Sequence, residues 1–177
     1  MHHANPFTEN RKLDAKEIFV RIWEREANAT ARVIRAFPPG SLNFKPHERS
    51  RSIRDLAWQC VIDERVIEKI LDGANDLRNV PPSPLPPESM EEIALAHEQA
   101  HRQAAEKMRG SEVQFSKTVT VTTRGGSIEL EQAETMWWNL LDQVHHRGQL
   151  TIYLRLSGGK VPSIYGPSGD EAISFTP

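Results

Sequence analysis

The sequence is most informative at Asp142-Gln143-Val144-His145-His146-Arg147-Gly148-Gln149-Leu150, which lies in a region of helical periodicity. Apolar residues recur there every three or four positions, and this pattern predicts a helix from about Leu130 to Leu156 that ends at Gly158-Gly159. An approximate heptad within this helix predicts a stripe beside or within the core-facing seam, made of Trp138, Asp142, His145, Gln149, Ile152 and Leu156.

Three further helices are predicted upstream by the same periodicity. The first runs from Leu13 to Phe37 and is stopped by Pro38-Pro39-Gly40-Ser41. The second begins after Ser52, whose side chain can cap it, and ends around Gly73. The third extends from about Pro87 to Arg109.

The connections complete the predicted architecture. Five prolines between Asn79 and Pro87 favour an extended crossover linker. The Val- and Thr-rich segment Lys117–Thr123, followed by Arg124-Gly125-Gly126-Ser127, predicts a short β-hairpin. The sequence therefore predicts an all-α fold, a four-helix bundle with a long crossover and a hairpin before the last helix.

Composition limits the classes of function. The length of 177 residues indicates one domain over 1–177, with a core at about 13–157 and an extension at 158–177. The chain has 22 Lys+Arg and 24 Asp+Glu, which gives a formal net charge of −2. This charge gives little attraction to nucleic acid, and no apolar run reaches the roughly 18 residues of a membrane helix. A single cysteine, Cys60, on the apolar stripe and no secretory signal pattern predict a cytoplasmic protein with a buried, inert thiol.

Asp142 and His146 are the first candidates for chemistry. They are four residues apart and share one face of the predicted helix, at a separation suited to one metal ion. Carboxylate and imidazole both bind divalent metals. The alternative is a hydrogen-bonded polar layer without metal.

The run His145–Arg155, followed by Gly158-Gly159-Lys160-Val161-Pro162 and Ile164–Ser168, resembles the C-terminal signature of the DinB/YfiT-like superfamily. Phe44-Lys45-Pro46 with Ser50–Glu64 resembles the second helix of that family, and the likeness extends from about residue 13 to 168. It implies a four-helix bundle with a long crossover, frequently a homodimer. It also implies a divalent metal held by three histidines, one from the second helix and two from the fourth. Members include thiol-dependent transferases, maleylpyruvate-isomerase-like proteins and metal-dependent hydrolases.

Carried onto this chain, the three histidine positions fall on Gln59, Asp142 and His146, so that one of the three is still histidine. Replacing two imidazoles by an amide and a carboxylate weakens the affinity for zinc and nickel, and it weakens the affinity for manganese less. Two alternatives follow from the resemblance. Either these residues hold Mn, Zn or Ni, with His145 as a supporting hydrogen-bond partner, or Gln59 bonds Asp142 or His146 and the site is metal-free. The substitutions favour the metal-free form.

The corresponding functions are a metal-dependent hydrolase or thiol-dependent transferase with a degraded metal triad, or a metal-free dimeric bundle that binds a small molecule or a protein partner. Catalytic residues and substrate are not indicated by the sequence. The loop Lys45–Arg51 is rich in basic residues and either is simply solvated or attracts an anionic substrate.

A second motif, His97-Glu98-Gln99-Ala100-His101, has the HExxH form of zinc proteases. It lacks the longer downstream signature, so we interpret it as a chance match with two histidines on a partly exposed helix face. In the alternative, His97 or His101 reaches across the bundle toward the metal positions.

Overall fold

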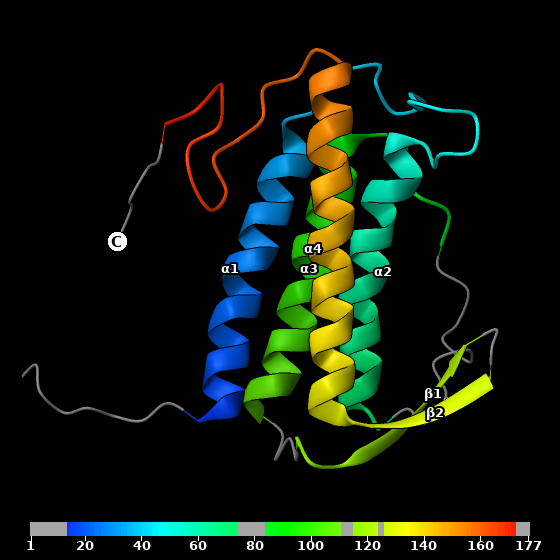
Figure 1. The fold of residues 1–177 in the computed structure, drawn as a ribbon, viewed down its shortest axis with the longest axis vertical. Helices are drawn as coiled ribbons and strands as arrows, with labels where there is room; N and C mark the ends of the chain where they lie inside the picture. Colours follow the sequence, from blue (N-terminus) through cyan, green and yellow to red (C-terminus); the bar gives the residue numbers. More distant parts are fainter. Residues whose placement is uncertain (1–13, 74–83, 111–114, 124–125, 173–177) are drawn as a thin grey trace, which may run out of the picture.

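The computed structural model describes residues 14–73, 84–110, 115–123 and 126–172. Four helices run side by side along the length of the molecule: α1 (Ala15–Arg35), α2 (Ile53–Leu71), α3 (Met90–Gly110) and α4 (Gln132–Leu156) (Figure 1). The strands β1 (Thr118–Thr123) and β2 (Gly126–Glu131) form an antiparallel hairpin directly before α4. The predicted fold class is confirmed.

Local signals fix where α1 and α2 begin. Asp14 and Glu17 form a capping box at the start of α1. Ser52, as predicted, caps α2 by accepting a hydrogen bond from the amide of Asp55 at 3.1 Å. The start of α2 is therefore set by the sequence next to it, and this start determines which side chains α2 directs toward α4.

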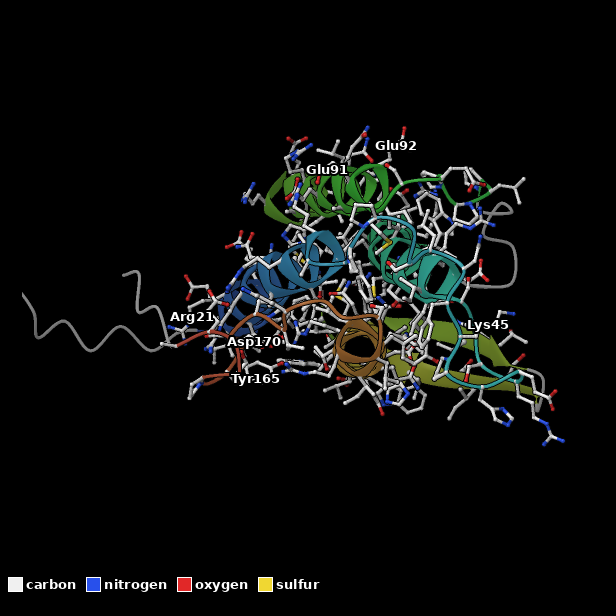
Figure 2. All side chains as sticks on the ribbon, turned by 90° about the horizontal axis from the view of Figure 1, so that it is seen from above. Arg21, Lys45, Glu91, Glu92, Tyr165 and Asp170 are labelled. Carbon is white, nitrogen blue, oxygen red and sulfur yellow. The ribbon has the colours of Figure 1, made fainter. Side chains whose placement is uncertain are left out.

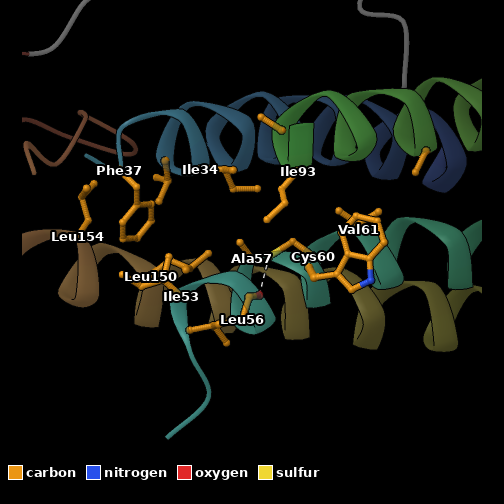
Figure 3. Close-up of a cluster of buried hydrophobic side chains, with 14 residues drawn as sticks. Ile34, Phe37, Ile53, Leu56, Ala57, Cys60, Val61, Ile93, Leu150 and Leu154 are labelled. Carbon is orange, nitrogen blue, oxygen red and sulfur yellow. Dashed lines mark hydrogen bonds between the residues drawn. The ribbon is translucent and has the colours of Figure 1, made fainter. Parts of the chain in front are cut away.

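Two apolar clusters fill the bundle. Figure 3 shows one of them, in which Cys60 and Ile53 of α2 lie among apolar side chains of the other helices. The second is built around Phe19 and Trp23 of α1. Phe19 meets Trp137 edge to face, with ring centroids 5.1 Å apart. Helix α2 packs against both α3 and α4, as does α1, so α2 and α4 are neighbours along the candidate site.

The start of α4 differs from the prediction. Leu130 belongs to β2, where it pairs with Val119, and both side chains are buried. The helix begins at Gln132, whose side chain donates a hydrogen bond to the carbonyl of Ile70 at 2.9 Å. Strand pairing with β1 therefore overrides helical periodicity at this end.

The face that α4 turns to the core also differs from the prediction. The expected core-facing stripe lies toward solvent: Trp138 is 51% exposed, Ile152 60% and Leu156 57%. Gln143 and Arg147 occupy core positions instead, together with Met136, Leu140, Leu150 and Leu154. Two polar side chains can be buried there because each has partners on other elements. Gln143 donates to Glu64 at 2.9 Å and Arg147 pairs with Glu26 at 2.5 Å.

The described segment after α4 returns along α1 (Figure 1). It is anchored by Tyr165, whose hydroxyl bonds Glu26 at 2.6 Å, and by Glu171, which pairs with Arg32 at 2.8 Å. Of the predicted crossover linker, 79–83 lies outside the described residues, and 84–87 contains neither helix nor strand. Within the described part of the chain, no helix has the length and apolar character needed to cross a membrane.

Candidate metal centre

Three potential metal ligands meet where α2 faces α4. Asp63 comes from α2, while Asp142 and His146 lie one turn apart on α4. His146 Nδ1 is 3.7 Å from Asp63 Oδ2 and 3.6 Å from Asp142 Oδ2. One ligand atom from each of the three residues lies within 4.8 Å of the others. The structure thus brings together the predicted pair Asp142 and His146, and adds Asp63, which the sequence analysis did not single out.

Burial makes this cluster unusual. The Asp63 side chain is 3% exposed and that of His146 13%, whereas Asp142 is 55% exposed and reaches solvent. Asp63 Oδ2 and His146 Nδ1 are buried atoms without a hydrogen-bond partner among the described residues. Buried polar atoms are nearly always paired, because leaving one unpaired costs free energy. A divalent cation would satisfy both atoms at once, so the residues present fit a metal.

The electrostatics of Asp63 agree with this fit. Burial raises the pKa of its carboxyl group, and the imidazole of His146 and the amide of Gln59 offset part of that rise. Among the described residues, the imidazole of His146 lies within ion-pair distance of Asp63, at 3.7 Å, and it carries a positive charge only when it is protonated. A cation bound there would supply that charge.

Gln59 lies one turn before Asp63 on α2. Its Nε2 donates to Asp63 Oδ1 at 2.9 Å, and its Oε1 accepts from Arg51 Nη1 at 3.0 Å. The amide is thus bonded to Arg51 and Asp63, and not to Asp142 or His146 as the metal-free alternative predicted. Coordination of a metal by Gln59 stays a prediction. In the structure, Gln59 holds one oxygen of Asp63 and leaves the other facing His146.

His145, the predicted supporting residue, is exposed. Its Nε2 lies 3.1 Å from Gln149 Nε2, and its ring centroid is 5.5 Å from that of His146. This contact of the His145 ring nitrogen runs along α4 and not to the ligand atoms. Its supporting role stays a prediction.

Two hollows lie on either side of the cluster. The first, of about 500 Å³, is largely apolar and is lined by Val66, Val121, Thr135, Trp138, Asn139, Leu141, Asp142 and His145. The second, of about 330 Å³, is largely polar and is lined by Arg49, Ser50, Arg51, Leu56, His146, Gln149 and Tyr153. One metal-ligand candidate, Asp142, borders the apolar hollow, and another, His146, borders the polar one.

The HExxH motif does not form a zinc-protease site. Its glutamate, Glu98, is held by Arg35 at 2.6 Å and is not free to act as a base over the two histidines. His97 is fully buried, so the predicted partly exposed face is wrong for this residue. Both histidines approach Glu64 instead of the metal cluster: His97 Nε2 at 3.7 Å and His101 Nδ1 at 3.2 Å.

Cys60 is buried, as predicted, and burial raises the pKa of its thiol. The thiol contacts the carbonyl oxygen of Leu56 at 3.9 Å, one turn earlier on α2 (Figure 3). A protonated thiol away from solvent is a poor nucleophile, so Cys60 is a core residue.

Comparison with known proteins agrees with this architecture. The model of the DinB family matches residues 9–173. The uncharacterized protein YrdA of Bacillus subtilis (strain 168) is 25% identical over 158 residues, which cover 89% of this chain and 92% of YrdA.

Solved structures show the same fold. A DinB-like protein from Bacillus cereus superposes with a TM-score of 0.64 at 21% identity, covering 83% of this chain and 95% of that one. The DinB-like protein YjoA from Bacillus subtilis gives a TM-score of 0.65 at 14% identity, over 81% of this chain and 94% of its own.

Proposed function

The chain belongs to the DinB family, and we propose that it is a metal-dependent member whose divalent ion is held by Asp63, Asp142 and His146. One observation carries this proposal. Two buried ligand atoms, Asp63 Oδ2 and His146 Nδ1, face each other without hydrogen-bond partners among the described residues, beside a third ligand that reaches solvent.

The donor set indicates which ions to test. Two carboxylates and one imidazole offer two negative charges, which a divalent cation balances. Carboxylates suit manganese better than three imidazoles would, while the imidazole also suits zinc and nickel. The half-exposed Asp142 leaves room for further ligands on the solvent side, as in catalytic and not structural metal sites.

The proposed reaction class is hydrolysis or thiol-dependent group transfer. A divalent ion would supply Lewis-acid chemistry, acidifying a water or a thiol in its coordination shell. The protein's own residues contribute position and access. Gln59 fixes the orientation of Asp63, the two hollows border Asp142 and His146, and the buried side of the cluster is closed to solvent by the bundle.

Elemental analysis of tag-free protein purified without chelators tests the proposal. We expect close to one equivalent of manganese, zinc or nickel after incubation with each ion. The His146→Ala and Asp63→Asn variants should each lose this metal.

Asp72→Asn is the matched control, because it removes an exposed carboxylate at the end of α2, away from the three ligands. This variant should keep the metal. Wild-type protein that binds none of the three ions would overturn the metal proposal, as would a His146→Ala variant with undiminished metal content.

A second candidate function is a metal-free bundle that binds a small molecule, and the apolar hollow beside Trp138 favours it. It predicts ligand binding that does not depend on added metal.

The homodimer implied by the family is a related proposal, supported by the exposed apolar side chains Ile152 and Leu156 on α4. Sedimentation velocity should then show a dimer that Leu156→Lys weakens, and a wild-type monomer at all concentrations would contradict it.

A further inference from the structure

Two arginines give the polar hollow beside His146 a positively charged lining. Arg49 and Arg51 both line it, and the lining includes no acidic side chain. Among the described residues, no carboxylate forms an ion pair with either arginine. Some other arginines on the surface do have such partners, for example Arg35 with Glu98 and Arg155 with Asp170.

The loop before α2 holds these two arginines at the site. The imidazole of His47 accepts a hydrogen bond from the amide of Arg49 at 3.2 Å, and the carbonyl of His47 accepts from the amide of Ser50 at 2.9 Å. These turns lead directly into the cap of α2. The basic loop Lys45–Arg51 therefore lies beside the metal-ligand region. If this loop attracts an anion, the anion would bind in the polar hollow.

The remaining polar groups in this hollow are also able to donate hydrogen bonds. They are the hydroxyls of Ser50 and Tyr153 and the amide of Gln149. Two guanidinium groups with neutral donors around them suit a carboxylate, phosphate or sulfonate, since such anions accept several hydrogen bonds. A neutral or cationic group would leave both positive charges unbalanced.

The hollow is connected to the metal ligands in two ways. His146 forms part of its lining, and Arg51 bonds Gln59, which bonds Asp63. An anion bound by Arg51 would thus lie one hydrogen-bonded residue away from the buried carboxylate.

The apolar hollow lies on the other side of the ligands, along the same helix. Leu141 lines the apolar hollow and Gln149 the polar one. Eight residues of helix separate them, which corresponds to about 12 Å. Asp142 and His146 lie between these two positions on α4.

We infer that this site takes an organic anion with an apolar body, its anionic group held by Arg49 and Arg51 and its apolar part held beside Trp138 and Leu141 roughly 12 Å away. The inference rests on the proposed function in one respect, namely that the group to be transformed lies between the two ends, at Asp142 and His146. The preference for an anion rests on the two arginines alone and is independent of the metal.

Isothermal titration calorimetry with a matched pair of probes tests this inference. The probes are 6-phenylhexanoate and 6-phenylhexan-1-ol, which have similar length and an identical apolar part. We expect the acid to bind at least tenfold more tightly than the alcohol, both before and after loading with manganese. Acetate, which has the charge without the apolar body, should bind much more weakly than 6-phenylhexanoate.

Variants locate the two ends of the ligand. Arg49→Gln combined with Arg51→Gln should abolish the preference for the acid and leave binding of the alcohol unchanged. Trp138→Ala should weaken both probes to a similar extent. Arg21→Gln is the control, because Arg21 is an exposed arginine of α1 on the opposite side of the bundle from the loop that carries Lys45 (Figure 2).

Equal affinity for the acid and the alcohol would overturn the inference. So would a preference for the acid that survives in the double variant or is lost in Arg21→Gln. A preference for the acid in protein that binds no metal would support the inference and contradict the proposed function. Metal binding without a preference for the acid would support the proposed function and contradict the inference. The failures of the two proposals can therefore be told apart.

Discussion

At the scale of single residues, the unpaired buried atoms where Asp63 faces His146 differ in their surroundings from those of His97. Asp63 Oδ2 and His146 Nδ1 face each other and the half-exposed Asp142. Both ring nitrogens of His97 also lack a hydrogen-bond partner among the described residues, but the nearest acid, Glu64, already accepts hydrogen bonds from Trp23 and Gln143. The first place has room for a cation among unsatisfied ligands, whereas in the second the carboxylate is already saturated.

His97 should make the protein sensitive to acid. Burial lowers its pKa, with His101 and Arg147 acting in the same direction and Glu64 and Glu98 opposing. Below the ordinary histidine pKa of about 6.5, the unfolded chain therefore binds a proton that the native state refuses, so this residue's contribution to stability falls as the pH falls.

The substitution His97→Leu tests this expectation. It should reduce the loss of unfolding free energy between pH 7.5 and pH 5.5, measured by urea denaturation. At pH 7.5 it should stabilise the protein by about 1 kcal/mol, because a buried polar ring without partners is removed. His47→Gln, at an exposed loop histidine, is the control and should keep the wild-type pH dependence. An equal acid-induced loss in His97→Leu and wild type would contradict the expectation.

The residue scale also shows what the sequence could and could not predict about the site. Asp142 and His146 are visible because an i,i+4 pair shares a helix face whatever the tertiary fold. Asp63 is not visible in this way, since it joins the pair across the contact between α2 and α4. One signal was available: Asp63 follows Gln59 by one turn, on the helix face that the family resemblance had already indicated.

At the scale of helices and strands, local start and stop signals predicted the boundaries of α1 and α2 well, whereas the start of α4 and its core-facing side were predicted wrongly. Ser52 marks the start of α2, and Pro38 follows the end of α1 closely. The core-facing side of α4 was missed because Gln143 and Arg147 look like surface residues. They are buried by partners on α2 and α1, which no local pattern contains.

The cap of α2 should matter for stability. Ser52→Ala removes the hydrogen bond to the amide of Asp55 and should lower the unfolding free energy by about 1 kcal/mol. Ser116→Ala, at an exposed serine outside the helices, should change it by less than about 0.5 kcal/mol. Urea denaturation of both variants checks the difference, and equal effects would show that the cap contributes nothing specific.

At the scale of the whole molecule, one buried ion pair connects three parts of the chain. Arg147 of α4 donates to Glu26 of α1 at 2.5 Å, and Tyr165 of the C-terminal segment bonds both residues. Arg147 is 2% exposed and Glu26 5%, so neither charge is solvated by bulk water. This contact fixes the position of α4 relative to α1, and with it the face that α4 presents to α2.

Breaking this pair should therefore be costly. Glu26→Gln leaves Arg147 as a buried, uncompensated charge and should lower the unfolding free energy by about 3 to 5 kcal/mol. Glu91→Gln is the control, since the pair of Glu91 with Arg35 is exposed and should be worth less than about 1 kcal/mol. Similar unfolding free energies for the two variants would mean that the buried pair is not structurally important.

Metal binding should stabilise the whole fold, because the ligands come from two helices and converge only in the native state. A divalent ion present at one hundred times its dissociation constant adds about 2.7 kcal/mol, which for a domain of this size raises the melting temperature by roughly 5 to 10 °C. The same concentration of the ion should leave the melting temperature of Asp63→Asn unchanged. Asp72→Asn removes an exposed carboxylate at the end of the same helix and should keep the shift. Melting temperatures followed by circular dichroism with manganese, zinc and nickel make the comparison. An equal shift in Asp63→Asn and wild type would mean that the ion binds elsewhere, and the buried atoms of Asp63 and His146 would then need another explanation.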